Sequence, residues 1–258
     1  MAADENPGER ESLQEGLQPA PRSASEDRHT GGAEAPLNED LAVALLKNSE
    51  VSSAELERLS KNGTLMKSRK LRLALVEHAK TPRHVSMPLV RHLYTFDLVQ
   101  VALAPAAPAD VKFAAEEALI NRLESVSSGE KLSLARLASG RVAGALLVDS
   151  EQRVVLTALD NSRLTESAVF KALMRADAPA ILVQAVCHHA KWSVRREVRV
   201  ALLRNQHTPL ARALEFARSL PAALAREVLQ TSRLPENIKV HLLQELTDSR
   251  RATRIAHS

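Results

Sequence analysis

The stretch VRREVRVALLRNQHTP, residues 194–209, decides the fold, because it holds a helix, the end of that helix and the start of the next. Ala201 and Leu202 follow Val198 by three and four residues, so the three side chains share one helical face. Asn205 comes next as the residue that would end the helix, and we call this position the reference residue. The Thr-Pro pair after it predicts a restart, since Thr can cap a helix and Pro fits a first helical position.

The same spacing recurs along the chain. Apolar or small residues stand seven, four and three positions before a reference residue in four further copies: Leu41, Ala44 and Leu45 before Asn48; Leu71, Ala74 and Leu75 before His78; Ala115, Ala118 and Leu119 before Arg122; and Val154, Thr157 and Ala158 before Asn161. A weaker sixth copy places Ile238, His241 and Leu242 before Glu245. Neighbouring reference residues are 30 to 44 positions apart. This predicts a repeat of about 40 residues with three helices per unit, and close helix contacts at the small fourth position.

Composition favours helices over strands. Apolar residues make up 45% of the 258 residues, but only one Trp, one Tyr and four Phe are present, so Leu, Ala and Val must fill the core. Ala and Leu have high helix propensity, whereas strands prefer β-branched and aromatic side chains. The sequence therefore predicts an all-α protein.

The chain changes character near residue 36. Residues 1–36 contain four Pro, four Gly, eight acidic residues and three Arg, with few large aliphatic side chains. Because this composition cannot bury enough apolar surface to order itself, we expect a disordered acidic tail. Residues 37–246 are expected to form the repeat domain and residues 247–258 a basic C-terminal tail. The whole chain carries +4 and the acidic tail carries −5, so residues 37–258 carry +9.

Cysteine content and hydropathy exclude several classes of site and location. Cys187 is the only cysteine, which excludes an intrachain disulfide and a site built from several thiolates. His188 and His189 follow it, but adjacent histidines point about 100° apart on a helix, so we expect a buried structural cysteine and neither a metal site nor a cofactor. No apolar run reaches the roughly 18 residues of a membrane span, and the N-terminus lacks the features of a signal peptide. We expect a soluble, cytoplasmic protein.

The stretch that opens at Trp192 resembles the HEAT-like and leucine-rich-repeat-variant α-solenoids, whose units tend to read V-R-x-x-V-A-x-N-x-x-T-P before a Leu-rich helix. The match is carried by Val194, Arg195, Val198, Ala201, Asn205, Thr208, Pro209 and Leu214. It is sharp at residues 193–217 and 71–93 and diluted over the rest of residues 37–246. The resemblance implies a right-handed superhelical α-solenoid of HEAT/armadillo-like repeats, and it implies little about activity.

Catalytic motifs are missing from the sequence. There is no phosphate-binding loop, nucleophile elbow or zincin motif, and GRVAG at residues 140–144 is interpreted as the start of a short helix. We therefore predict that the protein is not an enzyme. Trp192 is expected to close the hydrophobic seam between two repeats. The alternative follows from a resemblance to HEAT-like alkylpurine DNA glycosylases, in which tryptophan lines a basic groove that holds DNA.

Basic residues recur at matching distances before the reference residues. Arg72 and Arg199 stand six positions before the reference residue of their copy. Arg69 and Arg196 stand nine positions before it, and Lys112 and Arg195 stand ten positions before it. In HEAT and armadillo superhelices the last helix of a unit lines the concave surface, so these six residues, with Lys70 and Trp192, are candidates for a positively charged groove. A solvated helix face is the alternative, and acidic, amide or apolar residues at the same positions of the middle units favour it.

Two functions therefore compete. The first is a non-catalytic interaction scaffold that binds a protein or peptide, expected to be acidic, through its concave face. The second is a HEAT-like protein that binds nucleic acid in a basic groove, with or without glycosylase chemistry. The sequence predicts no binding to a membrane.

Overall fold

The computed structural model describes the backbone of residues 38–255 and the side chains of residues 38–247. Within that range the chain forms fifteen α-helices and one 3-10 helix, and no strand. This confirms the predicted all-α class. The acidic tail predicted for residues 1–36 lies outside the described residues, and so do nearly all side chains of the predicted basic tail.

The helices follow one another with short connections. The odd-numbered helices are α1 (Glu39–Leu46), α3 (Arg69–Glu77), α5 (Thr95–Leu103), α7 (Ser128–Leu137), α9 (Gln152–Leu159), α11 (Ala180–His188), α13 (Leu210–Ser219) and α15 (Glu236–Ile255). The even-numbered helices are α2 (Ser53–Lys61), α4 (Arg83–Val90), α6 (Ala109–Arg122), α8 (Gly140–Leu146), α10 (Glu166–Met174), α12 (Arg196–Leu203) and α14 (Ala222–Gln230). The 3-10 helix η1 (Leu65–Lys67) precedes α3.

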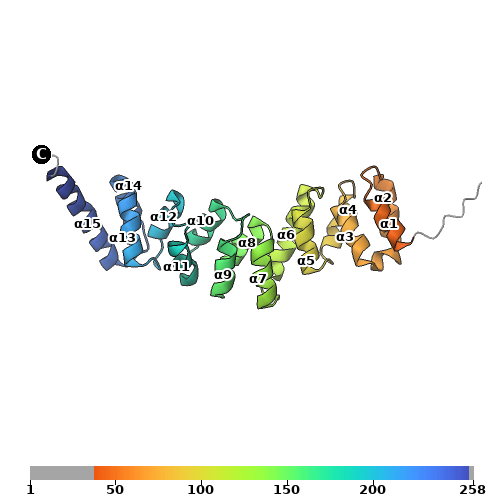
Figure 1. The fold of residues 1–258 in the computed structure, drawn as a ribbon, viewed down its shortest axis with the longest axis horizontal. Helices are drawn as coiled ribbons and strands as arrows, with labels where there is room; N and C mark the ends of the chain where they lie inside the picture. The colour runs from red at the N-terminus through yellow and green to blue at the C-terminus, as the bar shows by residue number, and fades with distance from the viewer. Residues whose placement is uncertain (1–37, 256–258) are drawn as a thin grey trace, which may run out of the picture. The chain divides into compact units, whose positions relative to one another are not determined.

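Most helices pack against the helix two places along the chain, which creates two rows (Figure 1). The even row runs without a break from α4 through α6, α8, α10 and α12 to α14. In the odd row, α1 packs on α3 and α3 on α5, α7 on α9 and α9 on α11, and α13 on α15. Every pair of helices with extensive contact in the described chain is at most two places apart. The core is therefore assembled from neighbours along the sequence.

Three helices lie between successive reference residues, as predicted: α4 to α6 between His78 and Arg122, and α10 to α12 between Asn161 and Asn205. The packing within a row, however, advances by two helices, and we call two consecutive helices a two-helix unit. Helices α2, α6, α10 and α14 begin at Ser53, Ala109, Glu166 and Ala222, so every two units occupy a nearly constant length of chain. One unit therefore averages about 28 residues, within the range of known structural repeats. The interval predicted from the reference residues differs from the packing interval because a step of three helices leads from one row to the other. The reference residues of α3 and α9 end odd helices, and those of α6 and α12 end even helices.

The predicted apolar columns coincide with the core in the middle copies. The residues seven and three positions before His78, Arg122, Asn161 and Asn205 are all buried. In the first copy the prediction is off by one residue, because Ala42 and Leu46 are buried while Leu41 and Leu45 are exposed. The sixth copy does not end a helix, since Glu245 lies inside α15.

The small fourth position lies at the edge of the buried face in most copies. Ala201 is fully buried, whereas Ala74, Ala118 and Thr157 are half-buried and Ala44 is exposed. The small fourth position is therefore fully buried only in α12, and in the other copies it is partly or fully open to solvent.

Two of the three asparagine reference residues, Asn161 and Asn205, join neighbouring helices of the same row. Asn161, after α9, donates its side-chain amide to the carbonyl oxygens of Ala135 (2.8 Å) and Ala138 (3.2 Å) at the end of α7. Asn205, after α12, donates to the carbonyl oxygen of Leu173 in α10 at 3.2 Å. Both side chains are buried. Carbonyl groups at a helix C-terminus have no partner within their own helix, so these donors satisfy groups that burial would otherwise leave unpaired.

The other reference residues make the same connection with different chemistry. Arg122, the last residue of α6, donates to the carbonyl oxygens of Arg91 and Leu93 after α4, each at 2.7 Å. The Nε2 atom of His78, after α3, lies 3.3 Å from the carbonyl oxygen of Asn48 after α1. Its Nδ1 atom accepts from the backbone N–H of Lys80 at 3.2 Å, so the proton lies on Nε2. The four reference residues from His78 to Asn205 therefore each link their helix to the previous helix of the same row.

The threonine of the Thr-Pro pair acts on the preceding helix, in contrast to the predicted cap on the following one. The hydroxyl of Thr208 donates to the carbonyl oxygen of Leu202 at 2.6 Å, and that of Thr81 donates to Leu75 at the same distance. A threonine does cap the following helix at Thr165, which accepts from the N–H of Ala168 in α10. A Thr after a reference residue can thus close the old helix or open the new one.

We predict that Asn161→Ala lowers the free energy of unfolding by about 1 to 3 kcal/mol, since buried carbonyl groups lose their donor. Asn161→Asp should lower it further, because a carboxylate accepts hydrogen bonds and cannot donate to a carbonyl. Urea denaturation followed by circular dichroism measures both. Asn121→Asp, on the exposed surface of α6, is the control and should have little effect. Parent-like unfolding of both Asn161 variants would contradict the linking role.

Candidate functional site

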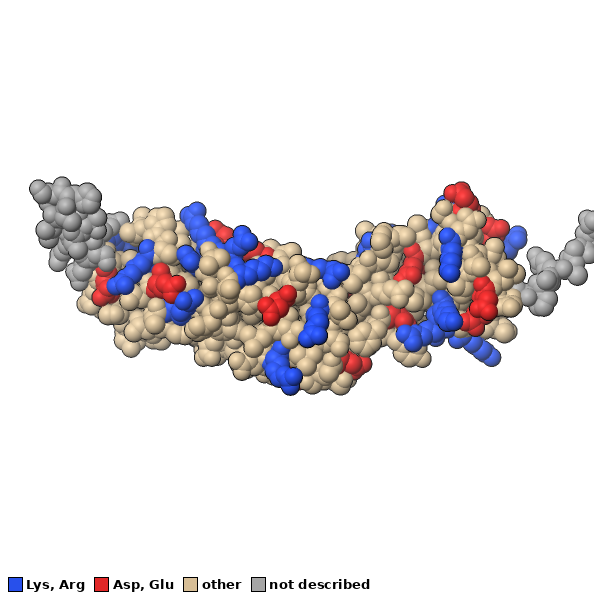
Figure 2. All heavy atoms as spheres, in the orientation of Figure 1, with Lys and Arg blue, Asp and Glu red and all other residues tan. Residues whose placement is uncertain are grey.

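The structure does not bring the predicted basic groove together. The eight candidates lie on helices that make no extensive contact with one another: α3 of the odd row carries Arg69, Lys70 and Arg72, whereas the even row carries Lys112 on α6 and Arg195, Arg196 and Arg199 at the start of α12, with Trp192 in the loop before it. Figure 2 shows lysine and arginine side chains interspersed with acidic ones across the face in view. The eight candidates thus do not form one continuous strip.

Several of these cations are engaged within the protein. Arg69 binds both carboxylate oxygens of the buried Asp97, through Nε at 2.9 Å and a terminal nitrogen at 2.7 Å. The guanidinium also lies over the Tyr94 ring, 5.2 Å from its centre. The Asp97 carboxylate raises the pKa of Arg69. Lys112 lies 3.4 Å from the carbonyl oxygen of Pro105, and Lys70 is exposed with no partner among the described side chains.

The α12 arginines divide into one structural and two exposed side chains. Arg199 donates from Nε to the carbonyl oxygen of Ser193 at 2.8 Å and lies 5.8 Å from the ring centre of Phe216. Arg195 and Arg196 are exposed and have no side-chain partner among the described residues. These two keep a free charge, but they lie in the opposite row from α3.

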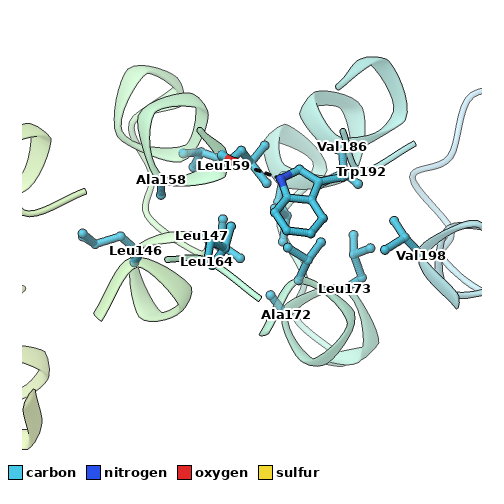
Figure 3. Close-up of a cluster of buried hydrophobic side chains, with 14 of the residues drawn as sticks. Leu146, Leu147, Ala158, Leu159, Leu164, Ala172, Leu173, Val186, Trp192 and Val198 are labelled. Carbon is cyan, nitrogen blue, oxygen red and sulfur yellow. Dashed lines mark hydrogen bonds between the residues drawn. The ribbon is translucent and has the colours of Figure 1, made fainter. Parts of the chain in front are cut away.

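Trp192 serves packing, the role that the sequence favoured. Its side chain is 2% exposed, and its indole N–H donates to the carbonyl oxygen of Leu159 at 2.8 Å. Figure 3 shows the ring among buried side chains that include Leu173, Val186 and Val198. A ring in this position joins the end of α9 to the loop before α12 and has no face to offer a ligand. It therefore does not line a groove.

The cluster at Cys187 has no reactive geometry. The thiol is fully buried, and burial raises the pKa of Cys187 to about 12. His188 contacts the carbonyl oxygen of Gln184 at 2.9 Å, and His189 contacts the Asp160 carboxylate at 3.2 Å, so each imidazole is engaged separately. No group of three His, Cys, Asp or Glu side chains that could hold a metal ion occurs in the described part of the chain.

A hollow of about 970 Å³ lies in the even row, at residues that were not predicted as a site from the sequence. It extends along α8 and is flanked by α6 and α10. Five small residues of its lining, which we call the floor, lie on α8 and α10: Gly140, Gly144, Ala145, Ala168 and Ala172. Small side chains surrounded by longer ones leave a depression, which explains why the hollow forms here.

Two glycines set the closeness of α8 to α10. A β-carbon on Gly140 would overlap the carbonyl oxygen of Arg163 in the loop before α10. A β-carbon on Gly144 would lie 3.2 Å from the β-carbon of Ala168. The prediction that GRVAG starts a short helix is confirmed, because α8 (Gly140–Leu146) begins at Gly140. The spacing of four in Gly140 and Gly144, repeated in Ala168 and Ala172, was the signal that could have indicated a floor of small residues.

Five basic residues surround this floor, and acidic neighbours neutralise three of them. Lys131 pairs with Asp149 at 2.8 Å, and both side chains are largely buried. Arg175 pairs with Asp177 at 2.8 Å; this pair is exposed, and the Asp177 carboxylate raises the pKa of Arg175.

The third neutralised residue, Arg141, pairs with Glu117 and lies 3.7 Å from Glu116. Its guanidinium also covers the exposed Phe113 ring, with 4.0 Å to the ring centre.

The remaining two basic residues keep their charge available. Lys171, on α10, is exposed and makes no ion pair or hydrogen bond among the described side chains. Arg163 is exposed and reaches only the carbonyl oxygen of Leu137, at 3.4 Å. The hollow is therefore a concave site with unneutralised positive charge on its α10 side.

A smaller hollow of about 590 Å³ lies in the odd row, between α9 and α11. Ala185 and the exposed Leu156 contribute to it, and the Asp160 carboxylate in its lining contacts the His189 ring. Because its lining contains no lysine or arginine, this hollow is suited to be a control site.

Comparison with protein-family models, curated proteins and solved structures finds no match for this chain. Among the described residues, no helix combines the length and the apolar character needed to cross a membrane.

We predict that Gly140→Ala lowers the free energy of unfolding by about 1 to 3 kcal/mol, because the added β-carbon forces α8 away from a backbone carbonyl group. Gly129→Ala is the matched control near the start of α7, where nothing lies within 4 Å of the new carbon. It should be neutral or stabilise by up to about 1 kcal/mol. Thermal denaturation measures both, and equal melting temperatures for the two variants would refute the close contact.

We also predict that Cys187 resists a thiol reagent such as Ellman's reagent in the folded protein at pH 8. The thiolate is the reactive form, and burial both raises the pKa and blocks access, so labelling should be at least about 100-fold slower than in urea. The rate of colour development with and without urea measures this, and Cys187→Ser supplies the background. Rapid labelling of the folded protein would show that the thiol is accessible.

Proposed function

We propose that this protein is a non-catalytic interaction scaffold, a right-handed superhelical α-solenoid that holds an acidic segment of a protein partner in the α6–α8–α10 hollow. The observation that carries the proposal is the hollow itself, with small residues on its floor and the free charge of Lys171 on its side. Its volume lies at the upper end of the range of about 300 to 1,000 Å³ typical of ligand sites.

The solenoid part of the proposal is supported by how the helices meet. Two-helix units follow one another at a regular interval, and extensive contacts join only helices that are one or two places apart. Repeat proteins in which each unit contacts its neighbours provide extended surfaces, and binding a segment of another protein is their commonest use. This architecture is also what the HEAT-like resemblance of residues 193–217 implies.

The nucleic-acid alternative receives less support. A groove that tracks a phosphate backbone needs a continuous series of cations, whereas the predicted basic residues lie in two rows and Arg69, Lys112 and Arg199 have partners inside the protein. Trp192 is too buried to stack on a base. A catalytic role for Cys187 receives no support, because its thiol is buried and its raised pKa keeps it protonated.

The test fills the hollow without changing the core. Ala145 is half-buried on the hollow floor, so Ala145→Trp should occupy the space and leave helicity and melting close to the parent. The matched control is Ala185→Trp, at a half-buried alanine in the odd-row hollow. Immobilised parent and both variants are incubated with cell extract, with and without nuclease treatment, and bound proteins are quantified by mass spectrometry.

We expect a set of proteins that the parent and Ala185→Trp retain from nuclease-treated extract and that Ala145→Trp loses. Retention of the same proteins by all three would refute the assignment of the hollow as the binding site. Loss of every bound protein after nuclease treatment would instead favour the nucleic-acid function.

A further inference from the structure

The two sides of the α6–α8–α10 hollow differ in chemistry. On the α10 side, Ser167, Lys171 and Arg175 line the hollow at intervals of four residues, so they form one ridge along the helix. On the α6 side, Ile120 and Leu123 line it with half-buried apolar side chains. The hollow is therefore polar and basic along one edge, apolar along the other, and lined with small residues between them.

We propose that the occupant of this hollow is an acidic amphipathic helix of a partner protein, with its carboxylates facing α10 and its apolar side chains facing α6. This inference rests on the proposed function and adds the chemistry and conformation of the bound segment. Placing an amphipathic helix in a groove between helices is a recurring mode of peptide recognition, read through anchors three, four and seven residues apart.

The floor favours a helix as the bound form. Gly144, Ala145 and Ala168 project little, so another backbone can lie close to α8. Ser167 and Lys171 are exposed donors four residues apart on α10, a rise of about 6 Å. A helix bound along α10 matches this interval with acidic residues four positions apart.

The charges around the hollow determine which face of the bound helix lies against α10 and which lies against α6. Lys171 has no acidic partner among the described side chains, and Arg175 shares its charge only with the exposed Asp177. Glu124, at the α6 side, is an exposed acid that would repel a carboxylate placed there. Acidic side chains of the ligand are therefore favoured on the α10 side and disfavoured on the α6 side.

The experiment selects ligands from random sequences, so it does not require the partner to be identified. A phage-displayed library of random 16-residue peptides is panned on the full-length protein and counter-selected on Ala145→Trp, so that only hollow-dependent peptides survive. We expect Asp or Glu at i and i+4, with large apolar residues on the adjacent helical face. Enriched peptides without acids, or with acids spaced by two residues as in an extended strand, would overturn the inference.

A charge reversal then tests the contact with α10. Lys171→Glu should weaken binding of a selected, fluorescently labelled peptide by about tenfold in an anisotropy titration, because an attraction becomes a repulsion. Lys70→Glu is the matched control, since this lysine is also exposed but lies on α3, outside the hollow. Circular dichroism confirms that both variants are folded. Equal losses in the two variants would show that only net charge matters and would overturn the inference.

The outcomes separate the inference from the proposed function. If no hollow-dependent peptide is enriched while extract proteins still depend on Ala145, the scaffold function stands and the acidic helix is wrong. If extract binding is also independent of Ala145, the hollow is not the site and both proposals fail.

Discussion

Side-chain donors at helix ends, bound to the last carbonyl groups of the previous helix in the same row, are the interaction on which this structure depends. A helix of eight or nine residues leaves about half of its carbonyl oxygens without an internal partner. In a stack of such short helices many of these groups are covered by the next unit. Asn161 and Asn205 satisfy them with an amide, and Arg122 with a guanidinium. Each unit thereby fixes the position of the next.

The same constraint explains why basic residues were a poor guide to a binding site. Arg212 donates to the carbonyl oxygen of Cys187, and Arg233 donates to those of Arg175 and Ala176 at 3.2 Å each. Arginine presents several donors in a fixed plane, which suits it to collect the carbonyl groups of a helix end. Much of the positive charge of this chain therefore belongs to the architecture, and the charge that is free, as at Lys171, is the informative part.

The sequence allowed the helical class, the helix ends and most buried positions to be predicted, because a period of 3.6 residues and the Asn and Thr-Pro signals are local. The two-helix interval of the packing was missed because Asn161 and Asn205 carry the same signal at the ends of helices in different rows, and the row is decided by packing. The hollow was missed because it depends on Gly140 meeting the backbone of Arg163, a contact between segments that are well separated along the chain. The four-residue spacing of Gly140 and Gly144 is visible in the sequence, but the segment that packs against them is decided by the fold.

In the proposed solenoid, two-helix units form a stack in which each unit is coupled mainly to its neighbours. Native-state hydrogen exchange on the parent and on Asn161→Ala, read by mass spectrometry, tests this most directly. In a stack, loss of one link should raise exchange in the adjoining helices α7 to α10 and leave α1 to α3 and α13 to α15 at parent rates. A uniform rise in exchange from α1 to α15 would show a single cooperative core and would contradict the claim.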